Sequence, residues 1–259
     1  MGRCIVNALS SAAERPTLMA SRRWLLLHGL GATGAVWTGV AAQLHARGDT
    51  VLCPDLPGHG EAAPLSAYTV PALAAALAPW LAGSQPTRII GHSLGGYVAL
   101  ALASGSDAPT PEAVWVLGTK LHFSAQERAR LMTLAARPAR LYASRAEALE
   151  RYRTVAGFAP TLALDDPCLA RGVIASAQGW HLATDPKAYA LDPTPFAQLL
   201  RAVRCPVAAA CGRHDPLVDI GALRAHVPAA VLLEGLGHNA QVEAPGRVLD
   251  WVLDRGEAR

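Results

Sequence analysis

The residues Gly91-His92-Ser93-Leu94-Gly95 place a serine inside a G-x-S-x-G pattern. The run before them, residues 86–90, ends in apolar side chains and is typical of a buried strand, whereas residues 97–103 are typical of a buried helix. A serine between a strand and a helix is held in a tight turn that pushes its hydroxyl group out of the sheet. The pattern therefore predicts that Ser93 is a nucleophile. The alternative is a glycine-rich turn with a surface serine.

A serine hydroxyl needs a base to accept its proton and a carboxylate to orient that base. After such a turn, the acid and then the histidine are expected later in the chain, each at the end of a strand. Asp215 follows the apolar run 207–212, and His238 follows the apolar run 231–233. Catalytic groups of parallel sheets cluster at the carboxyl ends of the strands. We therefore predict that Asp215 is the orienting acid and His238 is the base.

Asp219 is the competing acid, because it also follows the run 207–212. We expect it to begin the next helix as an N-cap, a position that aspartate favours. For three other histidines near these motifs we predict structural roles within turns: His28, His59 and His92.

An upstream turn could stabilise the negative charge that develops on a carbonyl oxygen under attack. The apolar run 24–27 leads into His28-Gly29-Leu30-Gly31. A turn of this kind can aim one backbone N–H at the oxyanion, and the residue after the nucleophile supplies a second. We therefore predict an oxyanion hole made by the backbone amides of Leu30 and Leu94.

Apolar runs typical of strands alternate with helical spacing, which predicts an α/β fold with a mostly parallel sheet and helices on both faces. Residues 1–23 are expected to be irregular or to contain one weak outer strand within residues 4–9. The alternation stops after Gly118 and resumes near Cys205. Between them, residues 125–134, 145–155 and 169–178 have helical spacing. We expect a core in two parts, residues 1–119 and 189–259, and a helical cap formed by residues 120–188.

Composition limits the classes of function. The 259 residues are 51% hydrophobic and 17% charged, which suits one large α/β domain with an insertion. A net charge of +3 is too small to indicate nucleic-acid binding. The five cysteines are scattered without zinc-like spacing, so we expect reduced thiols in a cytoplasmic protein, and neither a metal nor a cofactor.

No apolar run approaches the roughly 18–20 residues of a membrane span, so no membrane association is expected. Residues 1–6 do not resemble a secretory signal. Arg22-Arg23 directly precedes the first core strand. In a twin-arginine export signal, cleavage follows an apolar region that comes after the two arginines. Cleavage there would destroy the fold of this chain, so we do not expect Arg22-Arg23 to be such a signal.

Five segments, in order along the chain, resemble the α/β-hydrolase fold superfamily, in its small single-cap branch of carboxylesterases, carrier-protein methyl esterases and C–C bond hydrolases. They are LLLHGLG (25–31), PDLPGHG (54–60), GHSLGG (91–96), CGRHDPLV (211–218) and GLGHNAQVEAP (235–245). The resemblance implies an α/β-hydrolase fold and a cofactor-free serine hydrolase that cleaves a carboxylic ester or thioester through an acyl-enzyme. It also implies that the unmatched cap selects the substrate.

Two other functions stay open. Similar proteins use the same triad as C–C bond hydrolases or as lyases, including in a step of menaquinone synthesis, and fold and triad do not separate these reactions. A non-catalytic ligand-binding protein is the more remote alternative. Aspartate-dependent haloalkane dehalogenase and epoxide hydrolase chemistry is excluded, because the elbow carries a serine.

The expected cap is strongly basic. Between Lys120 and Arg153 there are eight Lys or Arg residues and three Glu residues, a local balance of +5. Such a surface could attract an acyl carrier protein, a coenzyme A thioester or a carboxylate substrate, or it could be a solvated face partly paired with its own glutamates. Phe123, Tyr152 and Trp180 are candidates both for an apolar acyl pocket and for the core of the cap.

Overall fold

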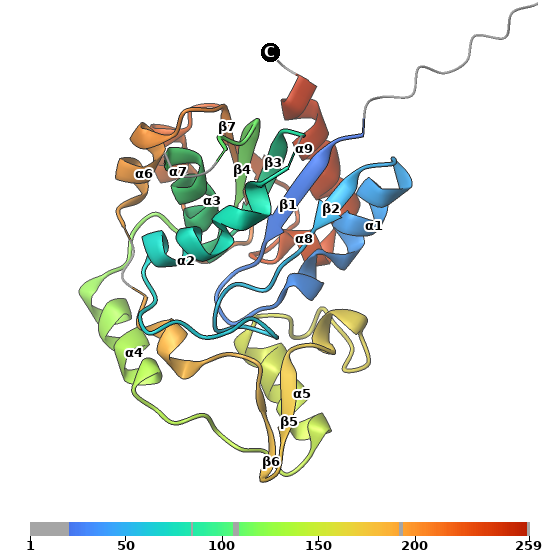
Figure 1. The fold of residues 1–259 in the computed structure, drawn as a ribbon, viewed down its shortest axis with the longest axis vertical. Helices are drawn as coiled ribbons and strands as arrows, with labels where there is room; N and C mark the ends of the chain where they lie inside the picture. The colour runs from blue at the N-terminus through green and yellow to red at the C-terminus, as the bar shows by residue number, and fades with distance from the viewer. Residues whose placement is uncertain (1–20, 84, 106–108, 192–193, 258–259) are drawn as a thin grey trace, which may run out of the picture.

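The computed structural model describes residues 21–83, 85–105, 109–191 and 194–257 (Figure 1). Its centre is a parallel sheet of six strands in the order β2-β1-β3-β4-β7-β8. These strands are β1 (Arg23–Leu27), β2 (Thr50–Leu52), β3 (Thr87–His92), β4 (Ala113–Leu117), β7 (Val207–Gly212) and β8 (Val231–Leu233). The predicted α/β class is confirmed, whereas the strand predicted within residues 4–9 lies outside the described residues.

Helices cover both faces of the sheet. One face carries α2 (Val70–Leu77), α3 (Leu94–Ser104), α6 (Phe196–Ala202) and α7 (Ile220–His226), and the other carries α1 (Thr38–Ala46), α8 (Ala240–Glu243) and α9 (Pro245–Glu257). Short 3₁₀ helices are η1 (Gly34–Trp37) and η2 (Ala78–Leu81) in the core and η3 (Pro167–Leu169) and η4 (Pro186–Tyr189) in the cap.

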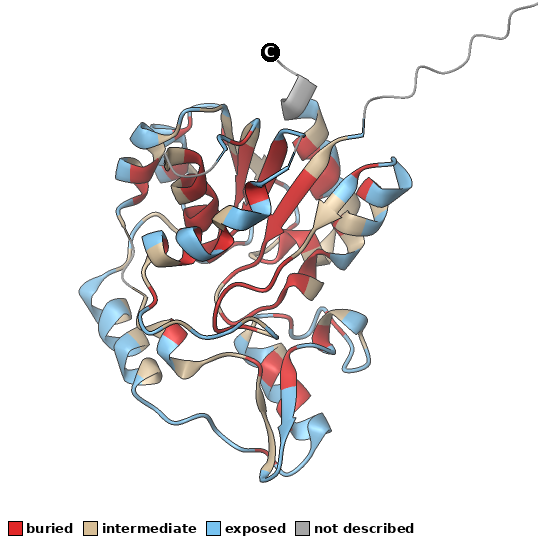
Figure 2. Ribbon diagram, in the orientation of Figure 1, coloured by how far each residue is buried: buried red, intermediate tan, exposed pale blue. Residues whose placement is uncertain are grey.

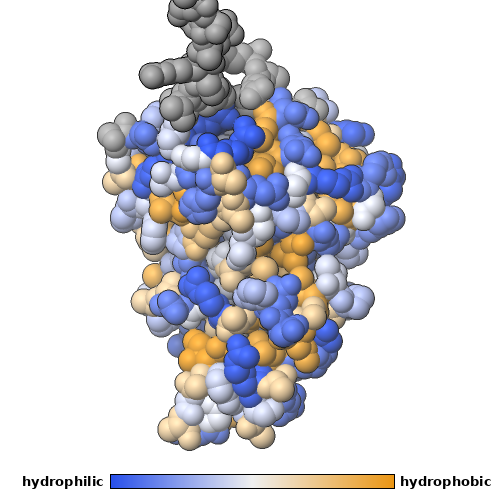
Figure 3. All heavy atoms as spheres, turned by 90° about the vertical axis from the view of Figure 1, so that its right-hand side faces the viewer, coloured by the Kyte–Doolittle hydropathy of each residue, from blue (hydrophilic) through white to orange (hydrophobic). Residues whose placement is uncertain are grey.

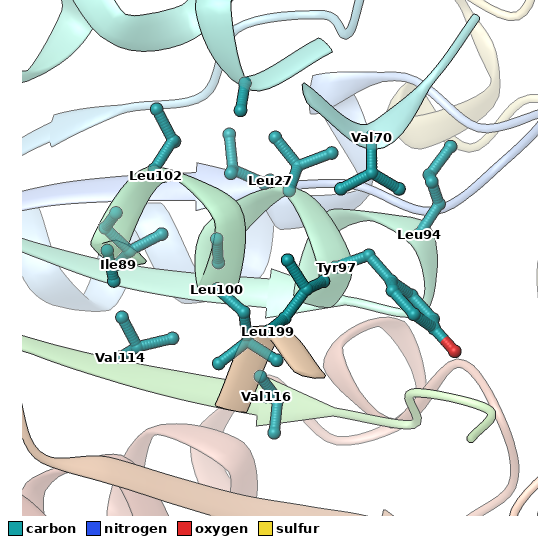
Figure 4. Packing of buried hydrophobic residues seen from close by; sticks show 14 of the residues in the cluster. Leu27, Val70, Ile89, Leu94, Tyr97, Leu100, Leu102, Val114, Val116 and Leu199 are labelled. Carbon is teal, nitrogen blue, oxygen red and sulfur yellow. The ribbon is translucent and has the colours of Figure 1, made fainter. Parts of the chain in front are cut away.

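The molecule has two hydrophobic cores, one on each face of the sheet. Residues of a strand belong alternately to one core and the other, because successive side chains of a strand point to opposite faces. Leu25 and Leu27 pack against the α2, α3 and α6 side, together with Ile89, Val114 and Val116 (Figure 4). Trp24 and Leu26 pack on the opposite side, together with Ile90, Trp115 and Leu117. Figure 2 shows the strands and α3 as the buried centre of the molecule. This buried frame holds the carboxyl ends of the strands in place.

The chain leaves the sheet after β4 and returns at α6 and β7. The excursion contains α4 (Ala125–Ala135) and α5 (Arg145–Val155), which match two of the predicted helices. The third predicted helix, at residues 169–178, is wrong. That segment contains η3 and the strand β5 (Val173–Ser176), which pairs antiparallel with β6 (Gly179–Leu182).

The hairpin replaces the helix for two physical reasons. Gly179 has φ 135°, a backbone conformation that L side chains rarely adopt and that suits the turn between the strands. Trp180 exchanges two backbone hydrogen bonds with Tyr142, at 2.7 and 2.9 Å, so a distant segment stabilises the extended form. The cap is therefore mixed in secondary structure, not purely helical as predicted.

In the described part of the chain, no helix is long and apolar enough to cross a membrane. On the face drawn in Figure 3, hydrophilic side chains lie between separate hydrophobic ones.

Candidate active site

Ser93 lies in the turn between β3 and α3 with φ 51° and ψ −115°. Among the described residues it is the one non-glycine residue with positive φ. Such a conformation costs on the order of 1–3 kcal/mol and persists only where the surroundings impose it. They do so here, because the Ser93 N–H donates to the Leu117 oxygen at 2.9 Å, and a Cβ on Gly91 or Gly95 would overlap a backbone carbonyl oxygen. The strained serine and the two glycines form one structural unit.

Asp215 and His238 meet at the carboxyl ends of β7 and β8. Nδ1 of His238 lies 2.9 Å from Oδ2 of Asp215, whose carboxylate is fully buried. The other carboxylate oxygen, Oδ1, accepts the Leu217 N–H at 2.8 Å. Because an ionised carboxylate only accepts hydrogen bonds, Nδ1 of His238 carries the proton and Nε2 is left as the basic nitrogen.

Asp219 has a different role in the structure. It is the N-cap of α7, where its Oδ1 accepts the Ala222 N–H at 2.6 Å. The geometry thus separates the two candidate acids, since Asp215 contacts His238 and Asp219 caps a helix.

Ser93 and His238 line the same cavity, of about 630 Å³. Among the hydrogen bonds of the described residues, none joins the Ser93 hydroxyl to the imidazole. Catalytic hydrogen bonds are often long before substrate binds and shorten in the Michaelis complex. The arrangement therefore brings the serine, the histidine and the aspartate to one site. The contact that is not formed is the hydrogen bond between the Ser93 hydroxyl and the His238 imidazole.

Leu30 and Leu94 also line this cavity. Leu94 is the first residue of α3, where backbone N–H groups have no intrahelical partner and the helix end carries partial positive charge. Within the described residues, neither the Leu30 nor the Leu94 amide donates to another group. The neighbouring Gly31 amide is occupied, because it donates to Nε2 of His59 at 3.1 Å. Two residues of the cavity lining thus have backbone amides without a hydrogen-bond acceptor among the described residues.

Three buried histidines surround the site. Burial, and next the proximity of His59, lower the pKa of His28 to about 3. Burial likewise lowers the pKa of His59 and holds the pKa of His92 well below its ordinary value. All three are therefore neutral near pH 7 and act as hydrogen-bonding groups with fixed tautomers.

Helix α4 contributes to the lining of the cavity that contains Ser93, through residues that include Leu131 and Leu134. Phe123, a candidate for the acyl pocket or for the core of the cap, also lines this cavity. The cavity lining does not include Tyr152 or Trp180, the other two predicted pocket residues. Tyr152 is fully buried under the cap against Phe158, and Trp180 packs on that core while β6 pairs with Tyr142. Of the two roles left open for Tyr152 and Trp180, packing in the core of the cap is the one that agrees with these contacts.

Sequence reasoning missed several residues that line the cavity: Tyr97, Val155, Tyr189, Leu191, Leu217 and Asn239. Asn239 directly follows the predicted base, and its Nδ2 donates to the oxygens of Ala156 (3.2 Å) and Gly157 (3.0 Å). It thereby ties the histidine loop to the end of α5. Its position in the matched segment GLGHNAQVEAP was the available signal.

Part of the positive charge of the cap is neutralised within the cap. Three basic residues are paired with glutamates of the same region: Lys120 with Glu127 (2.5 Å), Arg153 with Glu150 (2.8 Å) and Arg140 with Glu147 (3.9 Å). Lys120 lines the cavity together with its partner Glu127, and Arg128 and Arg130 line it as well. Arg128 and Arg130 therefore give the cavity lining its net positive charge, and we call this pair the cationic rim.

In the part of the chain that the structure describes, no cluster of three His, Cys, Asp or Glu side chains could hold a metal ion.

The family model "Alpha/beta hydrolase family" matches residues 24–251, which contain all of the groups above. The chain belongs to the alpha/beta hydrolase family. Esterases and thioesterases occur among its sequence relatives and structural neighbours.

The relatives differ in how much of the chain they match. A pimeloyl-[acyl-carrier protein] methyl ester esterase of Chromobacterium violaceum is 30% identical over 226 residues, which are 81% of this chain and 84% of that protein. An uncharacterized protein of Mycobacterium tuberculosis is 44% identical over 82 residues, which are 30% of this chain. That match spans only 24% of the relative's own length.

Solved structures support the fold of this α/β-hydrolase. E-2-(acetamidomethylene)succinate hydrolase aligns with a TM-score of 0.75 at 23% identity, over 92% of each chain. The thioesterase domain from the curacin biosynthetic pathway aligns with a TM-score of 0.73 at 22% identity, over 91% of this chain and 92% of that one. At these identities the likeness concerns the fold alone.

Proposed function

We propose that this α/β-hydrolase cleaves a carboxylic ester or thioester through an acyl-enzyme on Ser93. The observation that carries the proposal is the 2.9 Å hydrogen bond from His238 to the buried carboxylate of Asp215, with His238 and the strained Ser93 on one cavity. This is the arrangement that serine acyl transfer requires: a nucleophile, a base and a group that orients the base.

The reaction would begin with attack of Ser93 Oγ on the substrate carbonyl carbon while Nε2 of His238 takes the hydroxyl proton. Asp215 stabilises the imidazolium, and the amides of Leu30 and Leu94 donate to the oxyanion. Collapse of the tetrahedral intermediate expels the alcohol or thiol, which receives the proton from His238. Water then attacks the acyl-enzyme by the same steps and releases the acid. Each oxyanion donor would lower the barrier by roughly 3–4 kcal/mol.

The cavity supports a small-molecule acyl ester or thioester as substrate. Its lining combines leucine and aromatic side chains with the paired Lys120 and Glu127 and with the cationic rim of Arg128 and Arg130. An apolar interior suits an acyl chain, and the rim suits a leaving group with negative charge, such as coenzyme A or an acyl carrier protein. The relative from Chromobacterium violaceum, whose name states a carrier-protein ester, supports the same class.

A second reaction class uses the same groups. A C–C bond hydrolase or a lyase, of the kind used in menaquinone synthesis, would need the same serine, histidine and aspartate. A non-catalytic binding protein is disfavoured, because positive φ at Ser93 costs energy that simple ligand binding would not require.

The residue bounds of the cap and the compartment are also proposals. We propose that residues 120–188 form the cap between core parts 1–119 and 189–259, and that the protein works in the cytoplasm. Cys53, Cys168, Cys205 and Cys211 are free thiols, which suits a reducing compartment.

A fluorophosphonate probe tests the serine directly. We expect it to label the wild-type protein and not the Ser93→Ala variant. A panel of esters and acyl thioesters of increasing chain length, assayed with both proteins, would then identify the substrate class. Full ester turnover by a folded Ser93→Ala protein would contradict the proposal, and C–C cleavage without ester turnover would favour the alternative class.

A further inference from the structure

Two histidines cross-link the oxyanion loop (residues 28–31) to the turn at residues 55–60. Nε2 of His28, in the loop, accepts the N–H of Leu56 at 2.8 Å. Nε2 of His59, in the turn, accepts the N–H of Gly31 at 3.1 Å. The two rings meet edge to face with their centroids 5.2 Å apart, and both side chains are buried. The loop and the turn therefore hold each other through two reciprocal bonds.

The tautomer of His59 makes it an acceptor for Gly31. Its Nδ1 lies 3.1 Å from the oxygen of Pro57, which can only accept, so Nδ1 carries the proton and Nε2 keeps its lone pair. A buried amide that loses its acceptor is costly, so the Gly31 N–H has a strong preference for this position. Phe, which has a ring of similar shape and no acceptor, could not replace His59 without releasing Gly31.

The bond to Gly31 restricts the directions in which the Leu30 amide can point. The peptide unit between Leu30 and Gly31 is planar, so anchoring the Gly31 N–H also fixes the Leu30 carbonyl group and limits rotation of the Leu30 backbone. On the other side, Gly29 lies against the nucleophile, since a Cβ placed on it would be 3.1 Å from Cβ of Ser93. The loop is thus fixed at both ends, and the Leu30 amide has no hydrogen-bond acceptor among the described residues.

The cap anchors the turn that carries His59. The N–H of Gly60 donates to the Ala183 oxygen at 2.7 Å, and the N–H of Asp185 donates to the Gly58 oxygen at 2.8 Å. The Tyr68 hydroxyl donates to Oδ2 of Asp185 at 2.7 Å. Residues 183–185, the arm of the cap that returns to the core, therefore hold the turn. Through the turn and His59, they are linked to the oxyanion loop.

We propose that His59 is a positioning residue of the oxyanion hole: it anchors Gly31 so that the Leu30 N–H points at the reacting carbonyl oxygen, and the cap arm 183–185 sets its place. The proposal rests on the acyl-transfer function proposed above. His59 touches no substrate in this arrangement and acts only through the backbone of the loop.

The test compares three substitutions at one position. His59→Phe removes the acceptor, His59→Gln offers Oε1 at about the place of Nε2, and His59→Asn is too short to reach Gly31. We expect His59→Phe and His59→Asn to lower kcat at least ten-fold, with an upper bound near the ~10²–10³-fold loss of one oxyanion donor, while KM changes little. His59→Gln should recover most of the lost kcat. The exposed His45, on α1, supplies the remote control His45→Phe, for which we expect wild-type kcat.

Two further measurements separate positioning from simple structural damage. Affinity for a trifluoromethyl ketone, which mimics the tetrahedral intermediate, should fall by the same factor as kcat/KM in His59→Phe. Hydrogen exchange of the Gly31 amide should accelerate in His59→Phe and His59→Asn, and stay slow in His59→Gln, whatever the activity. If His59→Phe does not fold, the Gln and Asn variants make the same comparison.

Equal kcat in the Gln and Asn variants, or wild-type kcat in a folded His59→Phe protein, would overturn the positioning role and leave the proposed function intact. A loss of kcat with unchanged affinity for the ketone would also overturn it. A wild-type protein without any turnover that depends on Ser93 would instead overturn the proposed function, and this proposal with it.

Discussion

Nε2 of His92 donates a hydrogen bond to the main-chain oxygen of His238 at 2.8 Å, so the residue before the proposed nucleophile holds the loop of the proposed base. The two rings lie with their centroids 4.7 Å apart. Gly118 packs closely against both residues of the acid–base pair. A Cβ placed on it would lie 3.2 Å from the His238 oxygen and 3.3 Å from Oδ2 of Asp215. The elbow and the acid–base pair are therefore packed as one unit.

Substitution of His92 should disturb the base and the stability together. We expect His92→Phe to leave the His238 carbonyl oxygen without a donor, which costs roughly 1–3 kcal/mol in the free energy of unfolding. It should also lower kcat, because the His238 loop loses an anchor. His92→Gln, whose Nε2 can donate, should retain more of both. Denaturant unfolding and ester kinetics measure the two effects, and equal behaviour of the Phe and Gln variants would contradict the assigned bond.

The two candidate acids can be separated by matched substitutions. Asp215→Asn should lower kcat by about 10⁴-fold, because an amide at this position favours the wrong histidine tautomer. Asp219→Asn should leave kcat near wild type, since asparagine caps helices as well as aspartate does. Steady-state kinetics of the two variants check this, and the reverse ranking would show that Asp219 orients the base.

The buried histidines predict how stability depends on pH. The folded protein holds the pKa of His28 at about 3 and lowers those of His59 and His92, whereas in the unfolded chain all three titrate near 6.5. Below pH 6.5 the unfolded state therefore binds more protons, and the free energy of unfolding falls as the pH falls, until the folded-state pKa values are reached. The stability is fully present above pH 6.5.

Thermal unfolding at pH 7, 6 and 5 measures this effect. Each shifted histidine contributes up to about 1.4 kcal/mol per pH unit in that window. The variant His28→Gln keeps an acceptor for Leu56 and removes one titrating group, so its stability should depend less steeply on pH. A melting temperature that is unchanged from pH 7 to pH 5 would contradict the burial assigned to these rings.

The cationic rim predicts a response to salt. If Arg128 and Arg130 attract an anionic substrate, kcat/KM for an anionic acyl thioester should fall as salt rises past ~0.1 M, where the Debye length is about 10 Å. The value for a small neutral ester should barely change. Arg128→Glu with Arg130→Glu should lower the first value and spare the second. Arg137 is exposed and lies outside the cavity lining, so Arg137→Glu is the matched control. Equal salt responses for both substrates would assign the rim to an ordinary solvated surface.

The features that could be predicted from the sequence are those that depend on residues close together in the chain. Ser93 sits in a local pattern with its own strand, turn and helix, and Asp215 was preferred to Asp219 because it directly follows a strand. Contacts between distant segments could not be inferred in this way. The hairpin at Val173–Ser176 and Gly179–Leu182 is stabilised by Tyr142, and local helical spacing in residues 169–178 gave no sign of that partner.

The aromatic residues of the cap and the turn histidines show the same limit. Tyr152 and Trp180 have the residue types of an acyl pocket, yet their side chains complete a core whose other half comes from the sheet. His59 lies 28 residues from Gly31 in the chain, and their contact exists only because β1 and β2 are neighbours. Residue type indicated what these side chains could do, and only the tertiary arrangement decided what they contact.

The order of strands in the sheet has a consequence for the protein during its synthesis. β4 pairs with β7, with Val114 opposite Val207. The β4 edge of the sheet therefore stays uncovered until β7 has been synthesised. Asp215 and His238 lie beyond that point, and a ribosome that adds about 5–20 residues per second exposes Ser93 seconds before either arrives. A nascent or truncated chain that ends before β7 would carry the serine without its base. Such a chain would lack the proposed ester hydrolase activity, which would appear only once the last strands have joined the sheet.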